Sequence, residues 1–166
     1  PLEAVEGIER YRISSIEPNW LTDEIIDFGA SSTKFQHHCH MPLQSGSDRS
    51  LGLMRRRYTT ARFADRSAAV RRRMPDAFIG IDVIVGFPGE TEEEVTELAE
   101  FVKDIEFERL GCFAYSQEEG TPAALMPDQI DDEVKNHRAE IIMESQMNIM
   151  DRLGEKQVGG DITVLT

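Results

Sequence analysis

AFIGIDVIVGFPGET, residues Ala77 to Thr91, is the stretch that decides the fold. Residues 78–85 are almost all apolar and several are β-branched, which favours a buried strand. The turn Gly86-Phe87-Pro88-Gly89 cannot continue that strand, and Thr91 with Glu94 then forms a capping box that begins a helix. The stretch therefore predicts one β/α unit. Its apolar strand is typical of a parallel sheet covered on both faces, and ligands bind such sheets at the carboxyl ends of the strands.

The rest of the chain repeats this alternation of strand and helix. Predicted strands cover residues 11–16, 38–43, 78–85 and 110–116, and a last strand begins at residue 161. Predicted helices begin near Thr22, Ser47, Thr60 and Thr91, and a long amphipathic helix covers about residues 131–153. We expect Gly29 to end the first helix and a long loop to occupy residues 117–127. The pattern predicts an α/β fold with parallel strands, helices on one side, and an open or incomplete barrel.

The composition is ordinary for a soluble globular domain, since 40% of the 166 residues are hydrophobic and 30% are charged. No apolar run in the sequence has the length of a membrane span, and the N-terminus lacks the pattern of a signal peptide. Cys39 and Cys112 are too few for a disulfide framework, so we expect a reducing cytoplasm. Because the chain begins at Pro1 and not at methionine, we expect it to be a piece of a longer protein.

The net charge of −13 argues against indiscriminate binding to nucleic acid, but the charge is unevenly distributed. Residues 49–73 contain nine arginines and a single acid, so this segment carries +8 and the rest of the chain −21. The segment is either a solvated helix face that balances acidic neighbours or a local site for phosphate or carboxylate groups. The sequence leaves both interpretations open.

Polar residues gather near the carboxyl ends of the four predicted strands. They are Glu17, then His40, Gln44 and Ser45, then Asp82 and Glu90, and finally Tyr115 and Ser116. Because the carboxyl ends of parallel strands meet at one rim, we expect these side chains to line one ligand pocket.

Other kinds of chemistry are disfavoured. The run from His37 to His40 offers at most two ligands on one face of a strand, and no second cluster completes a zinc site, so no metal site is predicted. No order of serine, histidine and aspartate suggests a hydrolase, and the Gly86–Gly89 turn lacks the lysine of a phosphate loop. No lysine lies at a strand end, where an aldolase would need one. The residues alone therefore predict a ligand-binding fragment of an α/β barrel.

Five motifs, in order over nearly the whole chain, make it similar to a known family. They are Arg12–Pro18, His40–Ser47, Leu53–Thr59, Asp82–Thr91, and Phe113–Ser116 with Gly120–Ala124. Together they resemble the radical S-adenosylmethionine (SAM) methylthiotransferases, which insert a methylthio group into tRNA or into a ribosomal protein. Residues up to about 107 resemble the branch that modifies threonylcarbamoyl-adenosine in tRNA. Residues from Arg109 onward resemble the branch that modifies an aspartate of a small-subunit ribosomal protein.

The resemblance implies a partial (β/α) radical-SAM barrel, roughly the later four β/α units, over residues 1–155. Residues 156–166 would begin a C-terminal β-domain. The resemblance also implies two [4Fe–4S] clusters in the full-length protein, one held by a CxxxCxxC motif and used to cleave SAM reductively into an adenosyl radical. Cys39 and Cys112 match neither set of cluster ligands. We therefore expect the chain alone to be inactive and to retain the part of the barrel that grips SAM.

The resemblance implies SAM-binding roles for ten residues and assigns no catalytic residue. They are Glu17 at the ribose or amino group, Gln44 and Ser45 as polar contacts, Arg55 or Arg56 at the carboxylate, Val85 and Gly86 against the adenine, and Asp82, Tyr115 and Ser116 on the rim.

The leading hypothesis from the resemblance is a fragment of a cytoplasmic enzyme that methylthiolates a modified adenosine next to the tRNA anticodon. Two alternatives stay open. One is methylthiolation of an aspartate in a small-subunit ribosomal protein, and the other is a barrel fragment that lacks cluster ligands and performs no catalysis. No membrane partner is expected. The sheet edge at residues 11–16 would be exposed, so we expect self-association through it.

Overall fold

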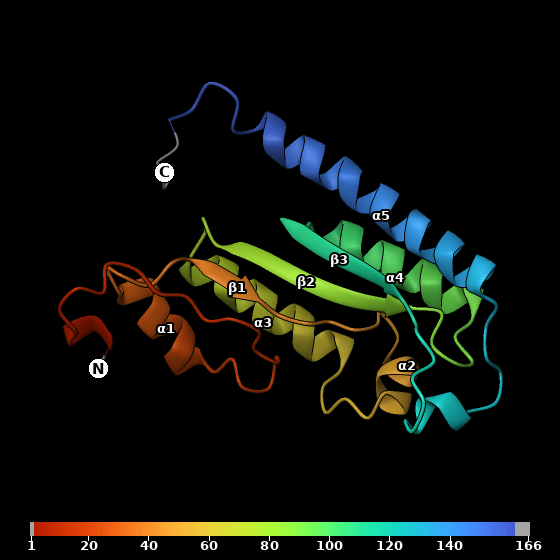
Figure 1. Ribbon diagram of the computed structural model, residues 1–166. Helices are drawn as coiled ribbons and strands as arrows, with labels where there is room; N and C mark the ends of the chain where they lie inside the picture. The colour runs from red at the N-terminus through yellow and green to blue at the C-terminus, as the bar shows by residue number, and fades with distance from the viewer. Residues whose placement is uncertain (1, 162–166) are drawn as a thin grey trace.

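The computed structural model describes residues 2–161, which form one parallel sheet with helices (Figure 1). The strands are β1 (His38–His40), β2 (Phe78–Val85) and β3 (Arg109–Ala114). The α-helices are α1 (Asp23–Ser31), α2 (Asp48–Leu53), α3 (Thr60–Arg73), α4 (Glu92–Ile105) and α5 (Asp132–Glu155). Short 3-10 helices cover Leu2–Ala4 and Ala123–Leu125. Among residues 2–161, no helix is long and apolar enough to cross a membrane.

The three strands are parallel and lie in the order β1-β2-β3, which confirms the predicted α/β fold. His40 of β1 faces Gly80 of β2, which in turn faces Arg109 of β3. The β2–β3 ladder continues to Val85 and Ala114. Parallel neighbours need long crossovers, and helices supply them here. The carboxyl ends of all three strands therefore point to the same rim.

One face of the sheet carries the hydrophobic core. Alternate side chains of β1 and β2 point to this face and are at most 2% exposed, namely Cys39, Ile79, Ile81, Val83 and Val85. Figure 1 shows α3 and α4 behind the sheet, and α5 packs along β3 and against α4.

The opposite face of the sheet is open in the described part of the chain. Phe78 and Phe113 point to it and are 36% and 57% exposed. The prediction of helices on one side is thus confirmed. The expectation of a sheet covered on both faces is wrong for residues 2–161, because these residues supply no second layer over the open face.

Residues 11–16 do not form the predicted strand. The segment meets the sheet through two isolated parallel bridges, Tyr11 with Phe35 and Ser15 with His40. Tyr11 and Ser15 are four residues apart in the sequence, whereas their partners Phe35 and His40 are five residues apart. One residue is therefore left over, as in a β-bulge, and a continuous ladder cannot form.

β1 is shorter than the strand predicted over residues 38–43. Pro42 has no N–H to donate to a ladder, and pairing resumes only as a single bridge between Gln44 and Val83. His40 to Gln44 is four steps, whereas Gly80 to Val83 is three, so one residue is again left over. Gln44 takes a left-handed backbone conformation, with φ 70°, at this irregularity.

The predicted helix starts agree with the structure to within one residue. Thr22 caps α1 and Ser47 caps α2. Thr91 and Glu94 form the predicted capping box at the start of α4. Thr59 caps α3, one residue before the position predicted for that cap.

Gly29 does not end α1 as predicted, because the helix continues to Ser31. A Cβ atom at this position would lie 2.9 Å from the Phe35 ring, so the glycine allows close packing there. At the other end of the chain, α5 ends at Glu155. The strand predicted from residue 161 onward lies, apart from Asp161, outside the described residues, and the domain boundary at 155 stays a prediction.

Candidate functional site

A cavity of about 410 Å³ lies at the carboxyl ends of the strands. We call it the rim cavity. Its walls come from the α2–α3 connection, the end of β2 and the loop after β3, and its lining includes Met54, Arg55, Arg56, Ile84, Phe87, Tyr115 and Met126. Most of these side chains are apolar, and the two arginines are the charged groups of the lining. Arg55, Arg56 and Tyr115 are among the residues that the sequence predicted for the site.

The structure pairs Glu17 with Arg56, which lines the rim cavity, although Glu17 is not itself among the lining residues. Arg56 Nη1 lies 3.1 Å from Glu17 Oε1, and the two side chains are 31% and 37% exposed. The Nε atom of Arg56 is buried without a hydrogen-bond partner. The charge of Arg56 is therefore balanced by a neighbour, although one of its donors is unused.

Arg55 is held differently. It follows the end of α2 in a left-handed backbone conformation, with φ 58°, at a position that glycine usually fills. Its N–H donates to Gly52 O, and the N–H of Arg56 donates to Leu51 O, which closes the end of the helix. No acidic partner of the Arg55 guanidinium exists among residues 2–161. Backbone strain in a non-glycine residue gathers at ligand sites, so Arg55 is the stronger candidate of the two arginines.

Tyr115 follows β3 and brings an unpaired hydroxyl to the rim cavity. Its Oη atom is buried and has no hydrogen-bond partner in the described part of the chain. Its ring meets Phe87 edge to face, with centroids 5.4 Å apart, and Lys135 Nζ lies 5.8 Å from the ring centroid. Buried hydroxyls are normally paired, so this one is a candidate for a ligand contact. Ser116, the next residue, is exposed, and its hydroxyl donates to Glu118.

Gln44 and Ser45 organise backbone beside β2 and are not among the residues that line the rim cavity. The N–H of Gln44 donates to Asp82 O at 2.8 Å, and its carbonyl accepts from Ile84 N–H at 2.9 Å. Ser45 is buried, and its Oγ accepts from the N–H of Ser47. Their roles toward a cofactor stay predictions.

The end of β2 is covered by α5. Val85 is fully buried and faces the core, and Gly86 turns the chain with φ 73°. A Cβ atom at Gly86 would overlap the side chain of Lys135, whose Nζ donates to Tyr115 O at 3.2 Å. The structure therefore gives Gly86 a role that the sequence did not suggest, which is to make room for Lys135. The adenine contact expected at Val85 and Gly86 stays a prediction.

Glu90 was expected at the rim, but the structure buries it under α5. Its Oε1 accepts from Gly86 N–H at 2.7 Å and from Arg138 Nη1 at 3.0 Å. Burial raises the pKa of this carboxyl, and the contacts with Gly86 and Arg138 only partly oppose that rise. Sequence reasoning missed Arg138 and Lys135 because they come much later in the chain. The signal that would have shown them is a pair of basic residues, three positions apart, on the buried side of a helix.

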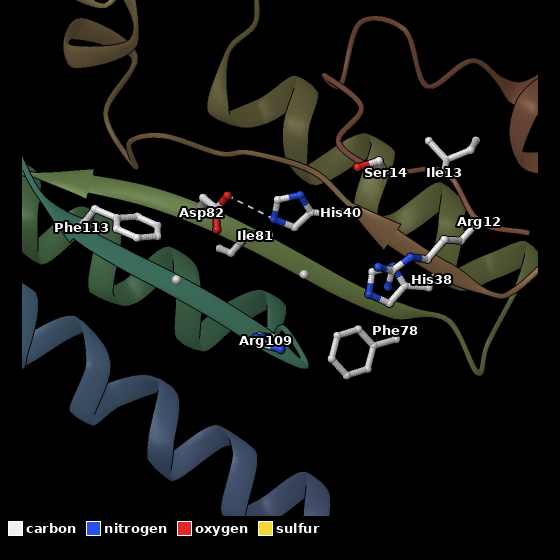
Figure 2. Close-up of a pocket in the computed structure, with 12 residues that line it drawn as sticks. Arg12, Ile13, Ser14, His38, His40, Phe78, Ile81, Asp82, Arg109 and Phe113 are labelled. Atoms are coloured by element: carbon white, nitrogen blue, oxygen red, sulfur yellow. Dashed lines mark ion pairs between the residues drawn. The ribbon is translucent and has the colours of Figure 1, made fainter. Parts of the chain in front are cut away.

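A second cavity, of about 350 Å³, lies on the open face of the sheet (Figure 2). We call it the inner-face cavity. Its lining includes alternate residues of the three strands and part of the segment before α1, namely Arg12, Ser14, His38, His40, Phe78, Gly80, Asp82, Arg109, Gly111 and Phe113. Asp82, predicted with the rim, lies here because it precedes the end of β2 by three residues on the face away from the helices.

His40 links Ser15 and Asp82 in a chain of hydrogen bonds. Ser15 Oγ lies 2.9 Å from His40 Nδ1. His40 Nε2 lies 3.2 Å from Asp82 Oδ2, the contact dashed in Figure 2. In the neutral tautomer protonated at Nε2, the ring donates to Asp82 and accepts from the Ser15 hydroxyl. Sequence reasoning did not find this arrangement because three separate segments supply its residues. The chain of bonds fixes the imidazole on the open face of the sheet.

The run from His37 to His40 does not act as one cluster. His37 Nδ1 lies 2.8 Å from Asp76 Oδ1, whereas Cys39 points to the core. Burial raises the pKa of Cys39 to about 11, and burial together with the charge of Glu90 raises that of Cys112 to about 12. Neither cysteine is therefore a thiolate at neutral pH. In the part of the chain that the structure describes, no group of three or more His, Cys, Asp or Glu side chains is placed to hold a metal ion.

Most of the arginine-rich segment balances the acids of the same chain. Six of its nine arginines form ion pairs: Arg49 with Glu94, Arg56 with Glu17, Arg62 with Asp65, Arg66 with Asp23 and Asp65, Arg71 with Glu108, and Arg73 with Asp23 and Asp27. Arg55, Arg57 and Arg72 have no such partner among residues 2–161. Charge balance thus explains the larger part of the segment, and three arginines remain available for an anionic ligand.

A family model described as the radical SAM superfamily matches residues 3–102. The chain is 51% identical over 134 residues to the threonylcarbamoyladenosine tRNA methylthiotransferase of Bacillus subtilis, which covers 81% of this chain and 30% of that protein. It is 43% identical over 161 residues to the tRNA-2-methylthio-N(6)-dimethylallyladenosine synthase of Thermobifida fusca, and the alignment covers 97% of this chain and 33% of that protein. It is 42% identical over 162 residues to the ribosomal protein uS12 methylthiotransferase of Lachnoclostridium phytofermentans, and the alignment covers 98% of this chain and 37% of that protein. The chain thus spans about a third of the length of these relatives.

A solved structure also resembles this chain. The coproporphyrinogen III oxidase of Escherichia coli, described as a radical SAM enzyme, aligns with a TM-score of 0.62 and 18% sequence identity. The alignment covers 87% of this chain and 32% of that one. At this identity the likeness concerns the fold alone, and it agrees with the partial barrel expected from the sequence.

Proposed function

Because the chain belongs to the radical SAM superfamily, we propose that it forms part of a methylthiotransferase that acts on a modified adenosine of tRNA. Two tRNA-modifying relatives support the proposal, one of them 51% identical over 134 residues. The proposal concerns the full-length enzyme, since the chain spans only about a third of these relatives.

The rim cavity is the observation that carries the proposal. It lies at the carboxyl ends of parallel strands, where α/β barrels bind their ligands. It combines apolar walls from Ile84 and Phe87 with the Arg55 guanidinium and the Tyr115 hydroxyl, which have no acidic or hydrogen-bond partner, respectively, among residues 2–161. These groups fit SAM, which has an adenine ring and a methionine chain that apolar walls can contact, and a carboxylate that an arginine can hold.

Arg55, Tyr115 and Glu17 each contact a different polar group of SAM in this proposal. Arg55 holds the carboxylate of SAM through paired N–H donors, and the Tyr115 hydroxyl donates to a second polar group of the ligand. Glu17, supported by Arg56, accepts from the amino group or the ribose. When bound beside a reduced iron–sulfur cluster, SAM supplies the hydrogen-abstracting chemistry of the superfamily. Supporting roles remain proposed for Gln44, Ser45, Asp82, Val85, Gly86 and Ser116.

We infer that the clusters, two in the full-length enzyme, use cysteines other than Cys39 and Cys112. These two lie on different strands, and burial is the main cause of the raised pKa of each thiol. The 166-residue chain, treated anaerobically with iron and sulfide, should therefore show no stoichiometric cluster absorbance. It should also release no 5′-deoxyadenosine from SAM, and release above background would overturn this inference.

The substrate class is tested by deleting the gene for the full-length enzyme in its host. The tRNA nucleosides and the ribosomal protein uS12 of the deletion strain are then analysed by mass spectrometry. The proposal expects the methylthio group to disappear from tRNA and uS12 to stay unchanged. The reverse result assigns the second candidate function, methylthiolation of uS12, which is favoured by a relative that matches over 162 residues.

Arg57 and Arg72 provide a second test of tRNA as substrate, because both are exposed and lack an acidic partner in the described chain. Arg57→Gln and Arg72→Gln in the full-length enzyme should weaken tRNA binding and reduce its dependence on salt concentration. Arg62→Gln is the matched control, since Arg62 already pairs with Asp65 at 3.3 Å. Equal effects of all three substitutions would assign the segment to charge balance alone.

A further inference from the structure

The amino end of the inner-face cavity gathers cationic and aromatic side chains (Figure 2). His38 and Phe78 face each other at the start of β1 and β2, with ring centroids 5.2 Å apart and ring planes within 9°. Arg12 comes from the segment before α1, and Arg109 is the first residue of β3. Three separate segments thus bring one imidazole and two guanidinium groups to the same cavity, and β2 adds the Phe78 ring.

No acid of the described chain pairs with Arg12 or Arg109. The one carboxylate among the lining residues is that of Asp82, and it pairs with His40 at 3.2 Å. The protein has a net charge of −13, and most arginines between residues 49 and 73 have found acidic partners. Arg12 and Arg109 thus line one cavity without an acidic partner among residues 2–161.

His38 is affected by the same excess of positive charge. Burial lowers the pKa of His38, and the charges of Arg12, His40 and Arg109 lower it further. Its Nδ1 atom is buried and finds no hydrogen-bond partner among residues 2–161. The ring is thus kept neutral close to two guanidinium groups, and it has an unused polar atom.

Glycines keep the floor of the cavity open. Gly80 lies between His40 and Arg109 in the register of the sheet, and a Cβ atom there would lie 3.3 Å from the His40 ring. A Cβ atom at Gly111 would lie 2.8 Å from Asp82 Oδ1. With hydrogen in place of both side chains, the cavity has a volume of about 350 Å³, which is enough for a phosphate or carboxylate group.

We propose that this end of the inner-face cavity binds a small oxyanion, a phosphate or a carboxylate group, between Arg12 and Arg109. Guanidinium groups hold oxyanions through paired N–H donors. A bound anion offsets the repulsion between the two arginines and favours a protonated His38. Neither Arg12, His38 nor Arg109 has a role in the proposal about SAM, so substitutions of the two arginines test this site separately.

The proposal is tested by titrating the 166-residue chain with inorganic phosphate at constant ionic strength while the ring signals of His38 are followed by NMR. Saturating phosphate should raise the pKa of His38. Arg12→Gln and Arg109→Gln should each weaken phosphate binding about tenfold or more, as expected for the loss of a charged hydrogen bond. Arg62→Gln is the matched control, because Arg62 lies on α3, pairs with Asp65 and does not line the inner-face cavity.

A parallel titration with acetate separates the two sources of the oxyanion. Tighter binding of phosphate assigns the site to a phosphoryl group, and equal or tighter binding of acetate assigns it to a carboxylate. Arg12→Lys and Arg109→Lys keep the charge and should restore part of the affinity, which excludes loss of the fold as the cause. The proposal is overturned if neither anion changes the pKa of His38, or if Arg62→Gln weakens binding as much as the other substitutions.

Discussion

Arg55 is a residue whose side chain and backbone conformation favour different choices of amino acid. It follows α2 in the left-handed region, with φ 58°, where glycine is the usual residue. A β-carbon in this region costs about 1–2 kcal/mol. The guanidinium lines the rim cavity and has no acidic partner in the described chain. A contact between this guanidinium and a ligand would explain why arginine and not glycine occupies the position.

Arg55→Gly should therefore stabilise the fold by about 0.5–1 kcal/mol, because relief of the backbone strain exceeds the added freedom of glycine in the unfolded chain. Urea unfolding followed by circular dichroism measures this change. Arg57→Gly is the matched control. Its backbone is not left-handed, so that substitution should destabilise by about 0.5–1 kcal/mol. A destabilised Arg55→Gly protein would contradict the account.

The sequence predicted the residues of the site only where their local position was enough. Tyr115 was found because it immediately follows a strand, whereas Arg55 and Arg56 were suggested by the family resemblance. Asp82 was misplaced because its face of β2 depends on which side the helices cover. Lys135, which occupies the space beside Gly86, was missed because its contact depends on how α5 packs.

At the scale of elements, Glu94 joins the starts of two helices. Its Oε2 accepts from Thr91 N–H at 2.9 Å in the capping box of α4. Its Oε1 accepts from the hydroxyls of Ser47 and Ser50 in the first turns of α2, and Arg49 Nη1 donates to Oε2 at 3.0 Å. The sequence predicted the capping box, which is local, but it did not predict the tie to α2, which is tertiary.

Glu94 should contribute stability that is lost in acid. Burial acts to raise the pKa of Glu94, but hydrogen bonds from Ser47, Thr91 and Ser50 outweigh it and the pKa is lowered. A lowered pKa in the folded state means that the contribution is present above the ordinary value of 4.5 and is lost as the pH falls below it. Glu94→Gln should cost about 1.5–3 kcal/mol at pH 7, since charged hydrogen bonds are lost.

Urea unfolding at a series of pH values from 7 to about 3 measures this prediction, because linkage relates the slope of stability with pH to proton uptake. The Glu94→Gln protein should lose less stability on acidification than the unsubstituted protein. Glu97→Gln, on the exposed side of α4, should change neither the stability at pH 7 nor the stability lost on acidification. Equal losses on acidification with and without Glu94 would be inconsistent with the lowered pKa.

Helices and strands were predicted correctly where local sequence alone determines the structure of the segment. β2 and the capped start of α4 agree with the sequence because apolar periodicity and capping are local properties. The strand predicted over residues 11–16 failed because pairing depends on the spacing of two segments, and here that spacing differs by one residue. The shortening of β1 has a partly local cause, the missing N–H of Pro42, which the sequence did show.

At the scale of the whole molecule, residues 2–161 form a sheet with one covered face and one open face. The segment over residues 11–16 meets β1 and its neighbours through only two bridges. The N–H of Tyr11 donates to Lys34 O and that of Ile16 to His40 O, whereas the N–H of Ser14 makes no backbone hydrogen bond in the described part of the chain. Unpaired edges favour association with another chain.

We therefore predict that the 166-residue chain self-associates through this edge. Sedimentation velocity over a series of concentrations should show a shift from monomer to dimer. Ser14→Pro removes a backbone donor from the edge and should weaken the association, whereas Ser14→Ala keeps the donor and should not. A monomer at every concentration, or equal effects of the two substitutions, would contradict this prediction.

The central claim is that the rim cavity binds SAM and that Arg55 holds its carboxylate. Isothermal titration calorimetry of SAM into the 166-residue chain tests it most directly, with Arg55→Gln compared to the control Arg72→Gln. The account predicts binding to the unsubstituted chain, about a tenfold or greater loss of affinity for Arg55→Gln, and no change for Arg72→Gln. Absence of binding to the unsubstituted chain, or unchanged affinity in Arg55→Gln, would contradict the account.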